Sequence, residues 1–120
     1  MTISDLWRNV AFLLVHPATP DDVNAEIIEM SLRVGASTYI KQNCAMLIHG
    51  DLRAVLPGIG VPIAVIVGRE DVLLPVEMSE EIHRLTPVST LHCKSDRGHL
   101  PPIEKPDAVA DLLRKLILQG

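Results

Sequence analysis

Two residues with the chemistry of an acid–base pair, Asp71 and His99, each follow a segment that is predicted to be a β-strand. Residues 63–67 are an unbroken apolar run rich in β-branched side chains, which is typical of a parallel strand covered by helices on both faces. Residues 88–93 mix polar and apolar side chains and indicate an edge strand. Because the carboxyl ends of parallel strands meet at one edge of a sheet, we expect Asp71 and His99 to lie close together.

Such a pair has a definite chemical capacity. A carboxylate can accept the Nδ1 proton of the imidazole and so leave the other ring nitrogen free to act as a general base. Each residue alone also has a simpler interpretation, because an Asp after a strand often only shapes a turn and a His in a loop is often solvated. Their shared placement after successive strands favours the functional pair. Glu70, next to Asp71, is interpreted as a solvated turn charge.

The segments that must position this pair divide the chain into a helical part, residues 1–56, and a part of alternating strands and helices, residues 57–120. Apolar residues at helical spacing predict amphipathic helices in the first part, which His16-Pro17, Gly35 and Gly50 are expected to end. The third of these helices is expected to carry Ile40, Cys44, Leu47 and Ile48 on one side.

The second part is expected to continue from strand to helix twice. A helix with an apolar face joins the two strands, Pro101-Pro102 is expected to keep the chain extended, and Lys105-Pro106-Asp107 begins the last helix. The predicted fold class is therefore α/β, a single domain over residues 1–120 with N-terminal helices followed by a parallel β-α-β-α unit.

Composition narrows the class of protein. The chain has 120 residues, of which 48% are hydrophobic, and this excludes a disordered composition. A formal net charge of −4 argues against a nucleic-acid partner. The apolar run of residues 11–15 is too short to span a bilayer, so no membrane partner is expected. Two isolated cysteines, Cys44 and Cys93, are interpreted as buried reduced thiols, which with the lack of a targeting pattern predicts a cytoplasmic protein.

Two stretches that contain the pair, residues 68–75 and 98–106, resemble the C-terminal half of proteins with the α/β-hydrolase fold. The similarity is to the esterases, enol-lactone hydrolases and carbon–carbon-bond hydrolases of that family. The resemblance implies that Asp71 is the acid and His99 the base of a Ser-His-Asp triad.

Weaker similarity extends upstream. Residues 51–53 and 56–62 are similar to the family's passage from a helical cap to the sheet, and residues 30–35 resemble part of the cap itself. The resemblance therefore implies a partial α/β-hydrolase fold in which residues 1–56 are cap-like.

The family's nucleophile is not recognisable in this sequence. Family members carry a serine in a G-x-S-x-G elbow upstream of the acid and base. Ser37 has Gly35 before it but Tyr39 after it, and no other serine has a glycine two residues away: Ser4, Ser31, Ser79, Ser89 and Ser95. An acid–base pair without a nucleophile and oxyanion donors cannot carry out acyl transfer, so we expect the chain to be inactive alone.

Two functions are compatible with these features. The chain is expected to supply the acid and base for hydrolysis of a small ester, lactone or carbon–carbon bond when a complementary chain supplies the nucleophile. Alternatively, it is a non-catalytic homo-oligomeric module that keeps Asp71 and His99 as a relic. A homodimer is expected because a two-stranded sheet leaves a free apolar edge. No cofactor or metal is predicted, since the other histidines and the cysteines lack metal-ligand spacing: His16, His49, His83, His92, Cys44 and Cys93.

Overall fold

A two-stranded parallel sheet organises the second half of the chain in the computed structural model, which describes residues 2–119. Strand β1 (Ile63–Gly68) pairs with β2 (Ser89–Lys94) in parallel, with a register that runs from Ile63 opposite Ser89 to Gly68 opposite Lys94. Both strands therefore end at the same edge, as the apolar run and its edge partner predict. The first four residues of β1 are only half-buried, because no second neighbour strand covers them among the described residues.

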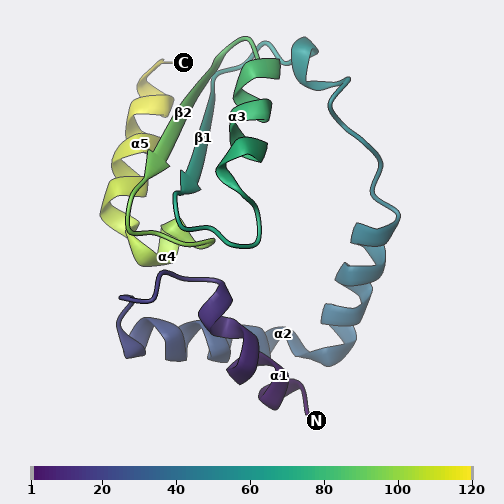
Figure 1. The fold of residues 1–120 in the computed structure, drawn as a ribbon. Helices are drawn as coiled ribbons and strands as arrows, with labels where there is room; N and C mark the ends of the chain where they lie inside the picture. The colour runs from purple at the N-terminus through teal and green to yellow at the C-terminus, as the bar shows by residue number, and fades with distance from the viewer. Residues whose placement is uncertain (1, 120) are drawn as a thin grey trace.

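Three helices accompany the sheet. Helix α3 (Val76–Leu85) connects the strands and α5 (Pro106–Gln119) follows β2, and Figure 1 shows them on opposite sides of the sheet. The short α4 (Pro101–Glu104) lies between β2 and α5. The prediction that Pro101-Pro102 keeps the chain extended is wrong. Proline suits the first positions of a helix, where its missing amide proton would have no partner, so these residues begin α4 instead.

The first half of the chain is helical, as predicted. Helix α1 (Ile3–Val10) begins with a capping box between Thr2 and Asp5, and the 3₁₀ turn η1 (Ala11–Leu13) continues it. Helix α2 (Asp21–Leu47) contains one non-helical residue, Gly35, with φ 76° and ψ 161°. This backbone conformation is essentially restricted to glycine, so the predicted break at Gly35 is confirmed. The 3₁₀ turn η2 (Leu56–Gly58) leads into β1.

A small core joins the two halves of the chain. Ala11, Val15 and Ile27 are buried together, and Leu100 and Ile103 from the far end of the sequence pack against them. Figure 1 shows α4 close to the N-terminal turn (residues 14–20, between η1 and α2), on the side of the sheet where both strands end. The edge of the sheet that carries the predicted site is therefore covered by the N-terminal turn.

The second half of α2 is mostly exposed. Leu47 and Ile48 are 86% and 87% exposed, and Ile40 and Cys44 are exposed as well. The prediction that both cysteines are buried is wrong, since Cys44 is exposed and Cys93 is half-buried. Helical periodicity reports that a face is apolar, but the described residues contain no surface that covers it. Among residues 2–119, no helix combines the length and apolar character that crossing a bilayer requires.

Candidate functional site

Asp71 lies in the turn that follows β1. Its amide donates to the carbonyl of Gly68 at 3.2 Å, which closes the turn. Its Oδ1 accepts hydrogen bonds from the amides of Leu73 and Leu74, both at 2.9 Å. The side chain is 6% exposed. The carboxylate is thus held in one orientation before any partner side chain is considered.

His99 approaches the other oxygen of this carboxylate. Its Nδ1 lies 2.9 Å from Asp71 Oδ2, and the imidazole is 29% exposed. Because a carboxylate only accepts, Nδ1 carries the proton, and in the neutral ring Nε2 keeps its lone pair. The two residues that the sequence predicts to lie together are therefore in hydrogen-bond contact.

The pKa of Asp71 reflects this environment. Burial of the carboxyl raises the pKa, but hydrogen bonds from the Leu74 amide, the His99 ring and the Leu73 amide together outweigh burial, so the pKa lies below its ordinary value. Asp71 is consequently ionised at neutral pH, which is the state that can orient a neutral imidazole and stabilise a protonated one.

The loops that carry Asp71 and His99 are joined through Glu70 and Arg97. The Glu70 amide donates to the Arg97 carbonyl at 3.0 Å, and the Arg97 amide donates to Glu70 Oε2 at 2.9 Å. That second bond is the main reason that the pKa of Glu70 lies below its ordinary value. The prediction that Glu70 is simply solvated is therefore wrong.

Close backbone approach at two glycines brings the loops together. A Cβ on Gly68 would lie 2.1 Å from the carbonyl oxygen of Gly98, and a Cβ on Gly98 would lie 2.8 Å from Cα of Val15. Any side chain at either position would collide with backbone. The Asp71 loop, the His99 loop and the N-terminal turn can lie this close only because both residues are glycine.

The N-terminal turn also contacts His99 directly. The carbonyl of Leu14 accepts from the amides of His99 and Leu100, at 2.8 and 3.1 Å. Glu104 accepts from the amides of His16 and Gly98. No pattern in the sequence predicts these contacts of Leu14 and Glu104. A backbone carbonyl has no side-chain signature, and two of the donors to Glu104, on His16 and Thr19, lie 88 and 85 residues away in the sequence.

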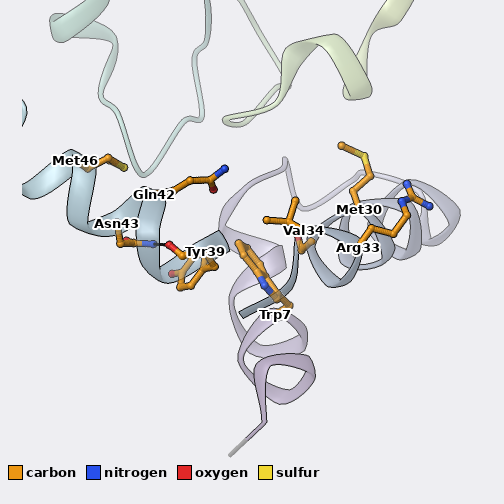
Figure 2. A pocket seen from close by; sticks show the side chains of 9 residues that line it. Trp7, Met30, Arg33, Val34, Tyr39, Gln42, Asn43 and Met46 are labelled. Carbon is orange, nitrogen blue, oxygen red and sulfur yellow. Dashed lines mark hydrogen bonds between the residues drawn. The ribbon is translucent and has the colours of Figure 1, made fainter. Parts of the chain in front are cut away.

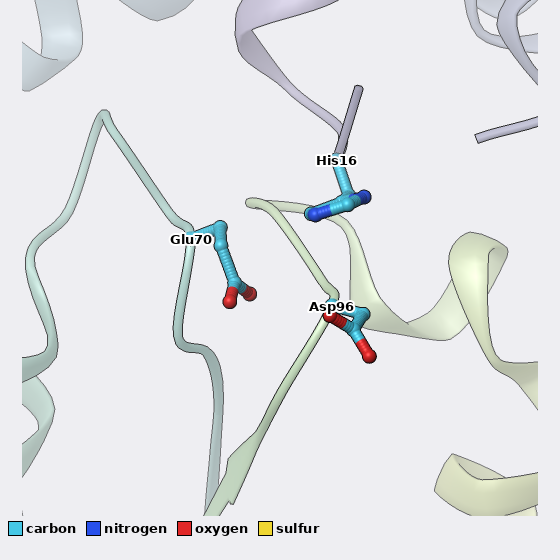
Figure 3. A group of neighbouring side chains, drawn as sticks. All are labelled: His16, Glu70 and Asp96. Atoms are coloured by element: carbon cyan, nitrogen blue, oxygen red, sulfur yellow. The ribbon is translucent and has the colours of Figure 1, made fainter. Parts of the chain in front are cut away.

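A second polar cluster lies beside the site. His16, Glu70 and Asp96 place potential ligand atoms within 4.8 Å of one another, although they come from three distant segments (Figure 3). The His16 Nδ1 accepts a hydrogen bond from the amide of Ala18 at 3.1 Å. In the neutral ring the proton then lies on Nε2, and a ring nitrogen that carries a proton does not bind a metal ion. The cluster fits a polar junction between loops better than a metal centre.

A cavity of about 620 Å³ lies in the helical half. Figure 2 shows that its lining comes from α1, through Trp7, and from both halves of α2, through residues such as Val34 and Tyr39. Trp7 meets Tyr39 edge to face, with ring centroids 5.4 Å apart. The lining is mainly apolar and does not include Asp71 or His99. This cavity suits an apolar group and has no chemistry of its own.

A nucleophile partner for His99 is not found in the described part of the chain. Within residues 2–119, no serine or cysteine side chain forms a hydrogen bond with His99, whose side-chain partner is Asp71. Ser89 does contact a histidine, with 2.8 Å from its Oγ to Nδ1 of His83, but this pair lies where β2 begins. The sheet therefore separates it from the edge that carries Asp71 and His99.

Comparisons with known proteins place these observations in context. A Karrikin insensitive 2 receptor of Petunia hybrida is 37% identical over 73 residues, which are 60% of this chain and 27% of the relative. A pimeloyl-[acyl-carrier protein] methyl ester esterase of Neisseria meningitidis is 26% identical over 107 residues, 89% of this chain and 42% of the relative. The chain thus spans less than half the length of these curated relatives. No family model matches it.

Solved structures of an esterase and of an α/β-hydrolase enzyme are similar to this chain over nearly all of its length. A thermophilic esterase from Thermogutta terrifontis matches with a TM-score of 0.82 and 25% identity, over 98% of this chain and 44% of the esterase. An α/β-hydrolase enzyme from a deep-sea metagenome library matches with a TM-score of 0.76 and 19% identity, over 98% of this chain and 50% of the enzyme. The second match concerns the fold alone. In both, about half of the other protein has no counterpart in this chain.

Proposed function

We propose that this chain, which has part of the α/β-hydrolase fold and is related to esterases, contributes the acid and the base of a Ser-His-Asp triad. Asp71 is the acid and His99 the base. The observation that carries the proposal is the 2.9 Å contact between Asp71 Oδ2 and His99 Nδ1, at the edge where two parallel strands end. The reaction class is hydrolysis of an ester, a lactone or a carbon–carbon bond in a small substrate.

The chemistry follows from the tautomer. With its proton on Nδ1, His99 can accept a proton at Nε2 from a nucleophilic hydroxyl and later donate it to the leaving group. The ionised Asp71 stabilises the imidazolium that forms between these steps. The nucleophile and the oxyanion donors would come from residues outside this chain, because no serine here stands in a G-x-S-x-G elbow.

A chimera tests this function. Residues 2–119 would replace the matched part of the Thermogutta terrifontis esterase, to which they are similar in fold with a TM-score of 0.82. We expect the chimera to hydrolyse p-nitrophenyl acetate, and we expect Asp71→Asn or His99→Gln to reduce kcat by about 10³-fold or more. Asp111→Asn and His49→Gln, both at exposed positions, are the matched controls.

Two results of the chimera would count against the function. One is a folded chimera, judged by circular dichroism, that does not turn over the ester. The other is a turnover that His99→Gln leaves unchanged.

The isolated chain is expected to show no serine-type esterase activity. Even when a triad is removed from a complete enzyme, residual catalysis comes from the oxyanion hole and substrate binding, and the oxyanion hole is not identifiable here. The measurement is release of p-nitrophenol with and without a serine-directed fluorophosphonate. A burst that the inhibitor abolishes would reveal a nucleophile within this chain.

The exposed apolar face of α2 favours a second candidate function, a non-catalytic module that assembles with itself. Met46, Leu47 and Ile48 are each at least 75% exposed. Within residues 2–119, β1 pairs with β2 alone, so the other edge of β1 offers unpaired backbone groups. In this alternative the contact between Asp71 and His99 only links two loops, and the chimera described above would remain inactive.

A further inference from the structure

Glu104, the last residue of α4, connects three segments of the chain through its side chain. Its Oε1 accepts from the His16 amide at 2.8 Å, and the Gly98 amide lies 3.1 Å from each of its two oxygens. The hydroxyl of Thr19 donates to the same carboxylate at 3.3 Å. Because the residue is half-buried, water cannot replace these acceptors without a cost.

Glu104 and the Leu14 carbonyl hold the backbone on either side of the His99 ring. Gly98, which immediately precedes His99, is bonded to Glu104, while the amides of His99 and Leu100 are bonded to the Leu14 carbonyl. The backbone on both sides of the imidazole is therefore fixed to the N-terminal turn. Figure 1 shows α4 next to this turn, between the sheet and the N-terminal helices. The remaining freedom of His99 is rotation of its side chain.

We propose that Glu104 is a positioning residue for His99, which acts by fastening the His99 backbone to the N-terminal turn so that Nδ1 stays against Asp71. This inference rests on the proposed function, because the orientation of His99 matters for catalysis only if the pair is the acid and base. Glu104 acts through the amides of Gly98 and His16 and does not itself contact the imidazole. As a consequence, the His99 imidazole keeps a fixed position relative to the N-terminal helices.

The experiment measures where the His99 ring carries its proton and how fast that proton exchanges. In the full chain labelled with ¹⁵N, NMR measures the fraction of His99 with its proton on Nδ1 and the exchange rate of that proton with water. In Glu104→Ala we expect the exchange to be about tenfold faster, because hydrogen bonds to a charged group are lost. In Glu104→Gln we expect a smaller increase, because the amide keeps one acceptor oxygen but turns a donor toward the Gly98 or the His16 amide.

The matched control is Glu80→Gln, at an exposed position of α3 with no hydrogen-bond partner among the described residues. It should leave the His99 proton unchanged. A purely structural role for Glu104 would lower the urea midpoint without altering the ring. Folded Glu104→Ala and Glu104→Gln variants that both exchange like the wild type would overturn the inference. If Glu104→Ala does not fold, wild-type exchange in Glu104→Gln alone would overturn it.

Asp71→Asn separates the two proposals. If this variant leaves the Nδ1 proton of His99 as in the wild type, the acid–base pair itself is wrong and the proposed function fails. If Asp71→Asn changes the ring but the Glu104 variants do not, the pair stands and only the positioning role of Glu104 fails.

Discussion

Three hydrogen bonds converge on the carboxylate of Asp71, and they decide the pH range in which this residue stabilises the fold. The pKa of Asp71 in the folded chain lies below the ordinary value of 3.8. The ionised carboxylate is therefore more stable in the folded chain than in the unfolded chain, relative to its protonated form. The stabilisation is complete above the unfolded pKa and is lost as the pH falls through the folded pKa.

We therefore expect the amount by which the free energy of unfolding of the wild type exceeds that of Asp71→Asn to become smaller as the pH falls below about 4. Urea unfolding at a series of pH values measures this difference. Asp111→Asn, which removes an exposed carboxylate paired with Arg114, is the control. A difference that does not depend on pH would show that the donors around Asp71 do not favour its charged form.

Gly98 is a second single residue on which the site depends, because one added carbon atom there would collide with the backbone. The added Cβ would lie 2.8 Å from Cα of Val15. Because this is a contact with backbone, a side-chain rotation cannot relieve it. We expect Gly98→Ala to lower the free energy of unfolding by about 1–3 kcal/mol and to disturb the NMR signals of His99.

Gly60→Ala is the control, because nothing lies within 4 Å of a Cβ at that position. Its effect should stay within about 0.5 kcal/mol. Equal stability of the two variants would mean that the crossing at Gly98 can relax without cost.

At the scale of elements, Gly35 decides the shape of α2. Its φ of 76° and ψ of 161° divide a helix of 27 residues into two segments. Alanine is the better helix former by about 1 kcal/mol, but this conformation costs a non-glycine residue about 1–3 kcal/mol. We expect Gly35→Ala to destabilise the chain in urea, or to straighten α2 with a gain of helical signal in circular dichroism. Unchanged stability together with unchanged helical signal would contradict the described break.

Elements were predictable from sequence where local chemistry determines them. The apolar run of β1, the break at Gly35 and the placement of Asp71 and His99 follow from residue type and strand direction. Pro101-Pro102 is compatible both with an extended chain and with the first turn of a helix, so residue type did not decide this segment. The hydrogen bonds of Glu104 depend on which backbone amides the fold brings near its carboxylate, and residue type does not report this. The apolar side around Leu47 shows that a face needs a partner, but residue type does not report whether this chain contains that partner.

The whole molecule has more apolar surface than its own elements cover. The free edge of β1 and the exposed end of α2 are both available for self-association, and closed two-fold dimers are the commonest solution. We expect light scattering at micromolar concentration to give twice the chain mass of 13.1 kDa.

Leu47→Glu should shift the dimer toward monomer, because it places a charge on the exposed apolar face. Glu77→Gln, at an exposed position of α3, is the control and should stay dimeric. A compact wild-type monomer that does not bind a hydrophobic dye would exclude the dimer.

The edge-to-face contact between Trp7 and Tyr39 has an optical consequence. The chain has one tryptophan and one tyrosine, and their ring centroids lie 5.4 Å apart. Light absorbed by the tyrosine should pass almost entirely to the indole while α1 stays against the second half of α2. Tyrosine emission would then be nearly absent from the native spectrum and would return when these helices separate. The native fluorescence of the chain therefore reports whether α1 and the second half of α2 remain in contact, without any added label.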